Sequence, residues 1–372
     1  MNKLKNFLYQ NAKKLLIFTV QLFGPNLLDK QSTLKKLKPY QIFSKDGETV
    51  VMPIAGATDS EIPETYKVEQ TATTSSIGVY KITNVEDFTI YPYGGVKLGK
   101  DVLDMDFGSA IFINTLFKSD DRETIKTDSC IVLWSHYWGE GFYDYILFIY
   151  AKLLRIKSAI GEVEFKKCKI IYPLVGTGFE IELLRYAGVD DYQIIDSRAY
   201  TVEANHFYIA NNDNWYHHNK HDLLQIRQTL SAIKTPVAKG NELIYIARKG
   251  RRRVTNEEEI IKVLKHFNFT IIEDKPRSVL EQITLYRNAK IIIGPHGASF
   301  ANILNCNPGT TLIELFPNKY HPDYFRFMSE IFGLNYFGIF EDGVIPTEYW
   351  SVNADMHINP NHIKNTLEKI LN

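Results

Sequence analysis

Cysteine is scarce in this chain. Among 372 residues only Cys130, Cys168 and Cys306 occur. Their number is odd, and their wide spacings match no zinc-binding motif. The sequence therefore predicts neither a disulfide framework nor a cysteine zinc site, and it favours a reducing, cytoplasmic environment.

Net charge is also lacking. The chain has 43 Lys and Arg residues against 43 Asp and Glu residues, which gives a formal net charge of zero. Non-specific binding to nucleic acid depends on counterion release by many unopposed basic side chains. The composition therefore excludes a strongly basic nucleic-acid-binding protein, and we expect no nucleic-acid partner.

Long apolar runs are missing as well. The best apolar run near the N-terminus, residues 15–20, is far shorter than the roughly 20 residues that span a bilayer. No small-residue cleavage site follows it, so we expect no signal peptide.

The first 40 residues are nevertheless unusual. They contain eight lysines and Asp29 as their only acidic residue, and apolar residues recur at helical spacing between Leu4 and Phe23. This pattern predicts a basic amphipathic helix. Two interpretations stay open: residues 1–30 lie on the anionic inner face of a cell membrane, as a peripheral contact, or they pack on their own domain.

The remainder has the length and the 45% hydrophobic content of two packed domains. Apolar strand-like runs alternate with amphipathic helical stretches, which predicts βαβ units and parallel sheets in two Rossmann-like halves. Capping boxes are expected at Thr255 with Glu258 and at Ser278 with Glu281. The predicted parts are a basic segment 1–40, an N-terminal domain 41–233 with a β-rich prelude 41–117 and a Rossmann-like part 130–233, a second Rossmann-like domain 240–350, and a tail with a helix, 351–372.

The most informative stretch begins with the apolar strand 290–294. A turn with His296 and Gly297 follows, and then a helix that starts near Ser299. A helix N-terminus after a glycine-bearing turn attracts phosphate, Gly297 allows close backbone approach, and His296 can bind a phosphate or sugar oxygen. Glu314, on the next strand, can accept hydrogen bonds from ribose hydroxyls. The alternative is a tight turn with a structural histidine.

The pattern Gly294-x-His296-Gly297-Ala298-x-x-x-Asn302, followed by Pro308-Gly309 and Ile313-Glu314, resembles the signature of glycosyltransferase family 61. That family includes plant β-1,2-xylosyltransferases, eukaryotic O-linked N-acetylglucosaminyltransferases and bacterial capsular polysaccharide enzymes. The resemblance implies an α/β fold of the GT-B type: two facing Rossmann-like domains, here with the β-rich prelude and the basic N-terminal helix added. The C-terminal domain would hold a nucleotide-sugar donor, and the N-terminal domain would bind a glycan acceptor.

By the same resemblance Arg248 faces the diphosphate, where its guanidinium can clamp two oxygens. Lys249, Arg252 and Arg253 are supporting candidates, although three adjacent arginines, 251–253, cannot all point inward. The remaining candidates for donor binding are His296, Gly297, Ala298, Ser299, Asn302 and Glu314.

The catalytic base cannot simply be carried over from the family, because the stretch 141–153 departs from the family pattern. Asp144 stands where the family has histidine, Ala151 stands for proline and Lys152 for arginine. An inverting transfer needs one group to take the acceptor proton, and Asp144 is our first candidate, with His136 and Glu140 as competitors. The alternative for Asp144 is a helix-terminal residue favoured by the helix dipole.

Two further patterns carry less weight. Asp104 and Asp106 match a short metal-binding pattern of another glycosyltransferase architecture, but we interpret them as turn or strand-surface residues. His217-His218 and His221 could place two imidazoles one helical turn apart, as in some metal sites. No third ligand of usual spacing is evident, so we favour a surface or acceptor loop over zinc. No metal and no cofactor are expected. Tyr320 and His321 either line the donor pocket or cap a loop.

These observations predict an inverting, metal-independent glycosyltransferase. We expect a bacterial enzyme of capsule or lipopolysaccharide biosynthesis, with a lipid-linked glycan acceptor at the cytoplasmic side of the membrane. The alternative is a catalytically inactive relative that binds glycan or nucleotide. A dinucleotide-dependent dehydrogenase is disfavoured, because no Gly-x-Gly-x-x-Gly follows a predicted strand.

Overall fold

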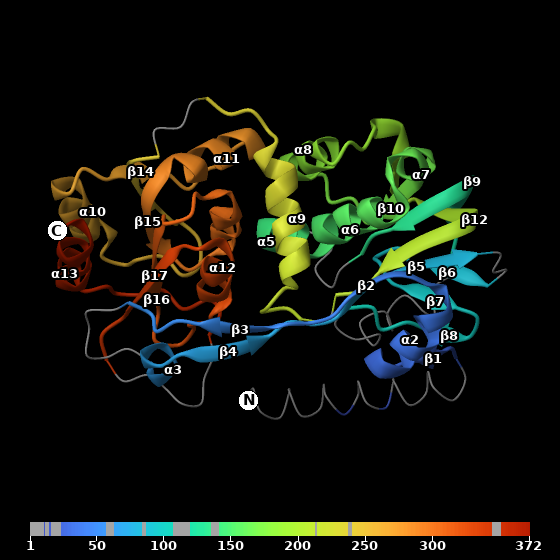
Figure 1. The fold of residues 1–372 in the computed structure, drawn as a ribbon, viewed down its shortest axis with the longest axis horizontal. Helices are drawn as coiled ribbons and strands as arrows, with labels where there is room; N and C mark the ends of the chain where they lie inside the picture. The colour runs from blue at the N-terminus through green and yellow to red at the C-terminus, as the bar shows by residue number, and fades with distance from the viewer. Residues whose placement is uncertain are drawn as a thin grey trace. The chain divides into compact units, whose positions relative to one another are not determined.

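The computed structural model describes residues 11, 15, 24–56, 63–83, 87–106, 120–134, 141–212, 214–236, 240–343 and 351–372. The chain divides into two compact units (Figure 1). Unit 1 comprises Met1–Gly47, Ser75–Trp215 and His221–Ile226, and unit 2 comprises Glu48–Thr74, Tyr216–Lys220 and Arg227–Asn372. Most of the basic segment 1–30 lies outside the described residues, and so do His136 and Glu140.

Unit 1 is built on a six-stranded sheet in the order β11-β10-β9-β12-β5-β2. Its first four strands run parallel, as the alternation predicts, and β5 and β2 continue it antiparallel. The strands are β2 (Gln41–Lys45), β5 (Ile77–Thr83), β9 (Glu123–Val132), β10 (Lys169–Tyr172), β11 (Ile194–Asp196) and β12 (Tyr200–Ala210).

A smaller sheet and a helix cover one face of this sheet. Apolar side chains of both sheets and of α2 form one continuous core, which includes Leu37, Val96 and Val132. The small sheet has the order β1-β8-β7-β6. These elements are β1 (Asn26–Leu27), α2 (Lys30–Leu37), β6 (Phe88–Ile90), β7 (Val96–Leu98) and β8 (Asp101–Val102).

Helices cover the other face of the six-stranded sheet, where α6 contacts β5 and β12. The predicted helix 142–156 is present and longer, and its middle part is a π-helix, Tyr145–Tyr150, which the sequence did not indicate. The helices are α5 (Phe142–Asp144), α6 (Ala151–Ile160), α7 (Glu162–Lys167) and α8 (Gly178–Tyr186); α9 (Lys220–Ser231) has residues in both units.

Unit 2 is built on a parallel five-stranded sheet in the order β14-β13-β15-β16-β17. Ile291 and Ile293 belong to the core on one face of the sheet. Ile292 between them is also buried but does not belong to that core, because successive side chains of a strand point to opposite faces of the sheet. The strands are β13 (Glu242–Ile246), β14 (Thr270–Ile272), β15 (Ala289–Pro295), β16 (Thr311–Phe316) and β17 (Asn335–Phe340).

Helices cover both faces of the sheet of unit 2. α10 and α13 lie on one side of the strands and α11 and α12 on the other (Figure 1), and the core of the first side includes Leu264 and Leu367. The helices are α10 (Glu257–His266), α11 (Val279–Asn288), α12 (Tyr324–Phe332) and α13 (Pro360–Leu371). The predicted helix after His296 is a 3-10 helix, η5 (Ala298–Asn305).

The predicted prelude 41–117 differs from the structure in one respect. Its antiparallel strands exist, but residues 48–74 belong to unit 2, with β3 (Thr49–Met52), α3 (Glu64–Lys67) and β4 (Gln70–Thr73). The reason is a buried arginine of α12, Arg326, which donates hydrogen bonds to the carbonyl oxygens of Pro53, Thr65 and Val68. Such long-range contacts leave no local signal in the sequence.

Local helix signals were partly right. The capping box of Ser278 with Glu281 is confirmed, with the Ser278 hydroxyl accepting from the main-chain N–H of Glu281. The box at Thr255 is wrong: Asn256 is the N-cap of α10, because the Thr255 hydroxyl donates to the carbonyl of Met356. Within the part of the chain that the structure describes, no helix has the length and apolar character to cross a membrane.

Candidate functional site

The strand order of unit 2 locates a candidate ligand site. Numbered from β13, the strand order is 2-1-3-4-5. In such sheets ligands bind at the carboxyl ends of strands 1 and 3, the topological switch point at which the strand order reverses. Arg248 follows β13 and His296 follows β15. Two predicted donor-site residues therefore lie at this switch point.

His296 is anchored through its ring. Its Nδ1 lies 2.5 Å from Oε1 of Glu314, and the Tyr336 hydroxyl donates to Oε2 of the same carboxyl group at 2.7 Å. The side chains of His296 and Glu314 are 4% and 0% exposed. Four aromatic rings also surround the imidazole at centroid distances of 5.3–5.6 Å, those of Phe316, Tyr320, Tyr324 and Phe325.

Burial sets the protonation of this pair. It lowers the pKa of His296 well below its usual value, and the charges of Arg252 and Arg248 lower it further, so the imidazole is neutral near pH 7. Burial raises the pKa of Glu314 well above its usual value, against the hydrogen bond from Tyr336.

Two guanidinium groups converge on the main chain of His296. Its carbonyl oxygen accepts from Nη1 of Arg248 at 3.2 Å and from Nε of Arg252 at 3.1 Å. Arg252 has φ of 60°, which turns its side chain inward, where it lies over the Tyr320 ring and is 6% exposed.

Neither guanidinium group is paired with an anion in the part of the chain that the structure describes. Among the described residues, no carboxylate oxygen lies within the 4.0 Å of an ion pair from either group. Burial and the neighbouring guanidinium groups lower the pKa of both, that of Arg252 to about 10, so both stay charged at neutral pH. Two adjacent, partly buried cations without an ion-paired carboxylate among the described residues have the charge and the donors to bind an anion with several oxygens, such as a diphosphate.

Gly297 makes room for this arrangement. A Cβ atom on Gly297 would lie 1.7 Å from Nη1 of Arg248. The group that approaches this glycine is therefore the protein's own guanidinium, and close approach of a phosphate to the backbone stays a prediction. Ala298 and Ser299 follow as the first, partly exposed residues of η5.

The structure corrects the predicted donor contacts of Arg253, Asn302 and Glu314, whereas that of Lys249 stays a prediction. The side chains of Lys249 and Arg253 are exposed, and Arg253 pairs with Asp355 of the tail at 3.0 Å. Asn302 is buried, and its amide donates to Gln282 and to the carbonyl of Ser299. Glu314 cannot reach a ribose in this geometry, because it is fully buried and both of its oxygens are engaged.

Sequence reasoning missed two residues of the site. Arg252 was named only as a supporting candidate. Its inward orientation depends on a left-handed backbone conformation at this residue, which the residue types of the sequence do not indicate. Tyr336 lies on β17, opposite Leu312 of β16, and no motif marks it. The expectation that residues 251–253 cannot all point inward is confirmed, since Arg251 and Arg253 are exposed.

In unit 1 the structure describes one of the three predicted catalytic residues, Asp144. It is half-buried in the first helical turn after Gly141, and a Cβ on that glycine would lie 2.6 Å from Oδ2 of Asp144. The carboxylate therefore folds back over the start of its own helix. His136 and Glu140 lie outside the described residues.

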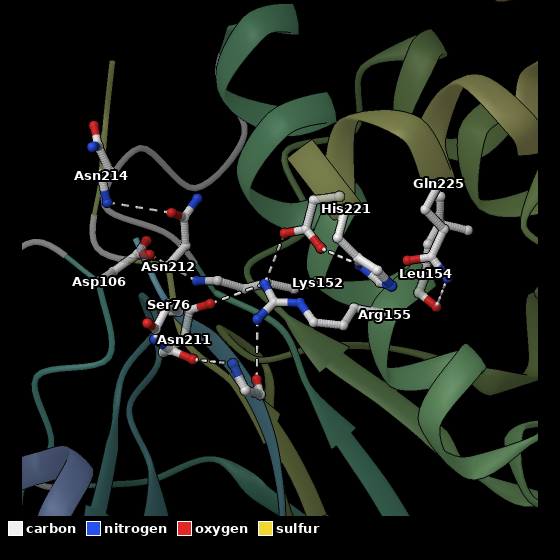
Figure 2. A network of polar contacts seen from close by, with 12 residues as sticks. Ser76, Asp106, Lys152, Leu154, Arg155, Asn211, Asn212, Asn214, His221 and Gln225 are labelled. Carbon is white, nitrogen blue, oxygen red and sulfur yellow. Dashed lines mark hydrogen bonds and ion pairs between the residues drawn. The ribbon is translucent and has the colours of Figure 1, made fainter. Parts of the chain in front are cut away.

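A buried polar network lies next to this helix (Figure 2). Nζ of Lys152 is 2.9 Å from Oδ1 of Asp106 and also donates to the carbonyl of Trp134, and both charged side chains are at most 1% exposed. Arg155 pairs with Asp222 at 3.0 Å and donates to the carbonyl of Asn211. The interpretation of Asp106 as a surface residue is thus wrong: it neutralises a lysine in the interior.

A second turn of unit 1 is occupied by its own carboxylate. The main-chain N–H groups of Val175, Gly176 and Thr177, between β10 and α8, all donate to Glu180, as does the Tyr172 hydroxyl. Glu180 is fully buried. Because the N–H groups of this turn are already bound, the turn offers no site for a phosphate.

The histidine group and the cysteines form no shared metal site. Nε2 of His217 lies 3.0 Å from Asp323, whereas His221 lies beside Asp222. Among the described residues, no three His, Cys, Asp or Glu side chains are grouped so as to hold a metal ion. The three cysteines are buried and free, as the absence of a disulfide framework predicts.

Comparisons with known proteins agree with the resemblance. Plant relatives match short stretches: the xylan glycosyltransferase MUCI21 of Arabidopsis thaliana is 31% identical over 83 residues, and a β-1,2-xylosyltransferase of the same plant is 27% identical over 101 residues. These alignments cover 22% and 24% of this chain, and the chain spans only 17% and 19% of the relatives' lengths.

A solved structure is also similar in part. The dodecameric iron-containing heptosyltransferase TibC in complex with ADP-D-β-D-heptose superposes with a TM-score of 0.33 at 11% identity, over 94% of each chain. The family model described as Glycosyltransferase 61 matches residues 81–313, which is more than half of the chain. The chain therefore belongs to glycosyltransferase family 61.

Proposed function

We propose that this protein is an inverting glycosyltransferase that moves a sugar from a nucleotide-sugar donor to a hydroxyl group of a glycan. One observation carries the proposal: Arg248 and Arg252 meet on the carbonyl of His296 at the switch point of unit 2, without an ion-paired carboxylate among the described residues. Family membership and the names of the plant relatives support a transferase acting on glycans.

The two guanidinium groups suit the charge that develops in such a transfer. The acceptor oxygen attacks the sugar C1 and gives its proton to a base, while the bond from C1 to the diphosphate oxygen breaks on the opposite face. Negative charge then builds on the departing nucleoside diphosphate, and fixed cations stabilise it. Because Arg248 and Arg252 supply this charge, we propose that the reaction needs neither metal nor cofactor.

The base remains a proposal. Asp144 is our candidate, because its half-buried carboxylate lies at the start of the helix that the family pattern marks. His136 and Glu140 are its competitors. By the resemblance alone, we also propose that the two units form the facing domains of a GT-B enzyme.

The biological setting is likewise proposed. A bacterial enzyme of capsule or lipopolysaccharide synthesis, peripheral at the cytoplasmic face of the membrane, would use a lipid-linked acceptor, and the lysine-rich residues 1–30 support this proposal. Co-sedimentation of the full chain with vesicles that contain or lack anionic phospholipid tests the membrane contact.

The activity is tested with a panel of nucleotide sugars in the presence of EDTA, by measuring nucleoside diphosphate release. We expect Arg252→Met to lower the release rate by about 100-fold or more, since loss of one charge-stabilising donor typically costs that much. Arg253→Met is the matched control, because its exposed side chain pairs with the tail; its rate should stay within about twofold of wild type.

Three results separate the parts of the proposal. Equal rates for Arg252→Met and Arg253→Met would refute the diphosphate site. Full activity of Asp144→Asn would remove Asp144 as the base. Tight binding of a nucleoside diphosphate without any release from the panel would favour the inactive, nucleotide-binding relative.

A further inference from the structure

His296 carries the family signature, and its ring faces the interior instead of the ligand. Nδ1 is bound to Glu314, four aromatic rings enclose the imidazole, and the side chain is 4% exposed. The part of His296 that reaches the candidate anion site is its main-chain carbonyl, which accepts from both Arg248 and Arg252.

Resting on the proposed diphosphate site, we infer that Tyr336, Glu314 and His296 form a chain of positioning residues, which fixes the His296 carbonyl so that Arg248 and Arg252 are held ready for the diphosphate. In this role Tyr336 fixes the Glu314 carboxyl group, Glu314 fixes the imidazole, and the fixed residue presents its carbonyl. None of the three touches the donor.

The geometry supports each link. Glu314 lies opposite Gly294 of β15 and Gly338 of β17 in the parallel sheet, so its carboxyl group is held between two strands. The main-chain N–H of His296 donates to the carbonyl of Leu315, the residue after Glu314. His296 is thus tied to β16 through both its ring and its backbone, and its carbonyl has little freedom to move.

Preorganisation explains why this matters for two cations. Two guanidinium groups on one oxygen repel each other. Each also donates to a carbonyl of its own, Arg248 to Arg251 at 2.6 Å and Arg252 to Val352 at 2.8 Å, and the His296 carbonyl is the acceptor that brings the two groups together. Holding them in place before the ligand arrives lowers the cost of ordering them on binding. The chain Tyr336–Glu314–His296 should therefore change donor affinity, and it should affect the chemical step less than loss of either guanidinium group does.

The test uses the full-length protein and the tightest binder among UDP, GDP, CDP and ADP. Dissociation constants are measured by calorimetry, and kcat and KM by nucleoside diphosphate release. We expect Tyr336→Phe to raise Kd and KM about 3- to 10-fold, as for loss of one ordinary hydrogen bond. With saturating donor, kcat should fall far less than the roughly 100-fold expected for Arg252→Met, because both guanidinium groups are still present.

A matched control exists in unit 1. Tyr172 donates to the buried Glu180 at 3.1 Å, just as Tyr336 donates to Glu314. Tyr172→Phe should lower thermal stability by a similar amount and leave Kd unchanged. A general loss of stability would move both variants alike, whereas a positioning role moves Kd only for Tyr336→Phe.

Two substitutions of Glu314 separate the effect of its hydrogen bonds from the effect of its charge. Glu314→Gln keeps a hydrogen-bonding group for His296 and Tyr336, so its Kd should stay within about threefold of wild type, whereas Glu314→Leu should raise Kd about 10-fold or more. If Glu314→Gln is as damaging as Glu314→Leu, a proton or charge of the pair acts on the ligand, and the positioning role is overturned.

Failure of this inference differs from failure of the diphosphate site. If Arg252→Met weakens binding but Tyr336→Phe leaves Kd and KM at wild-type values, the site stands and the positioning chain is refuted, even where Glu314→Leu does not fold. If Arg252→Met binds as wild type does, the diphosphate site itself is refuted.

Discussion

Two pairs of buried or partly buried cations, one pair in each unit, are treated in opposite ways. In unit 1, Lys152 pairs with Asp106 and Arg155 pairs with Asp222 (Figure 2). In unit 2, Arg248 and Arg252 share a neutral carbonyl oxygen. The first arrangement compensates charge within the fold, and the second leaves positive charge for an external anion.

This difference indicates which charged groups hold the fold and which bind a ligand. Burying a cation without a partner costs several kcal/mol, so a folded protein usually supplies a carboxylate. Where it does not, and the cations stay near the surface end of a sheet, a bound anion can supply the compensation. The turns repeat the contrast: Glu180 fills the turn of unit 1, whereas among the described residues of unit 2 no carboxylate is paired with Arg248 or Arg252.

The largest effect that tests this contrast concerns Lys152. Lys152→Met leaves the carboxylate of Asp106 buried and uncompensated, so the free energy of unfolding should fall by about 3–5 kcal/mol. Urea denaturation measures it. Lys126→Met, which breaks the exposed pair with Glu203, should change the free energy by less than about 1 kcal/mol. Equal effects of the two variants would contradict the structural role of the buried pair.

An intermediate effect is expected at Gly297. The Cβ of Gly297→Ala would meet Nη1 of Arg248, so the guanidinium must shift, at a cost of about 1–3 kcal/mol for an overpacked site. Nucleoside diphosphate binding, measured by calorimetry, should weaken by about 10-fold, which is about 1.4 kcal/mol. Gly178→Ala in unit 1 is the control, because a Cβ there meets no atom within 4 Å. Unchanged binding by Gly297→Ala would show that Arg248 need not lie where it does.

The smallest effect is a pH dependence of stability that belongs to Glu314. Its pKa is raised by burial above the unfolded value near 4.5, so the folded state binds the proton more tightly. That stabilisation is fully present below about pH 4.5 and is lost as the pH rises through the pKa of the folded state. Glu314→Gln cannot titrate and lacks this loss.

Urea denaturation of both proteins between about pH 4 and pH 8 measures this linkage. The unfolding free energy of the wild type minus that of Glu314→Gln should fall as the pH rises. Glu64→Gln, which changes an exposed side chain, corrects for the general effect of removing one carboxylate. A difference that stays constant with pH would contradict the raised pKa.

Much of the fold was predictable, because it rests on local and periodic signals. Alternating apolar runs and amphipathic stretches specify βαβ units, and both parallel sheets follow. The capping box at Ser278 is a contact over three residues and was predicted correctly. The box at Thr255 was not, because Met356, about 100 residues away, competes for its hydroxyl.

The candidate site was predictable only in its location. The turn with His296 and Gly297 and the strand before Arg248 were recognised, since each is a local motif. Which side chains point toward the candidate site was not predictable from the sequence. Glu314 and Asn302 point into the protein, and Arg252 replaces Arg253, because the left-handed backbone at Arg252 reverses the order of inward and outward side chains.

The sequence by itself determined the class of fold, the family and the segments that carry the site, because these depend on patterns between near neighbours in the chain. Only the tertiary structure decided that residues 48–74 join unit 2, that Asp106 neutralises Lys152, and that Tyr336 lies behind Glu314. Each of these depends on a contact between residues that are more than 20 positions apart, and no local pattern encodes such a contact.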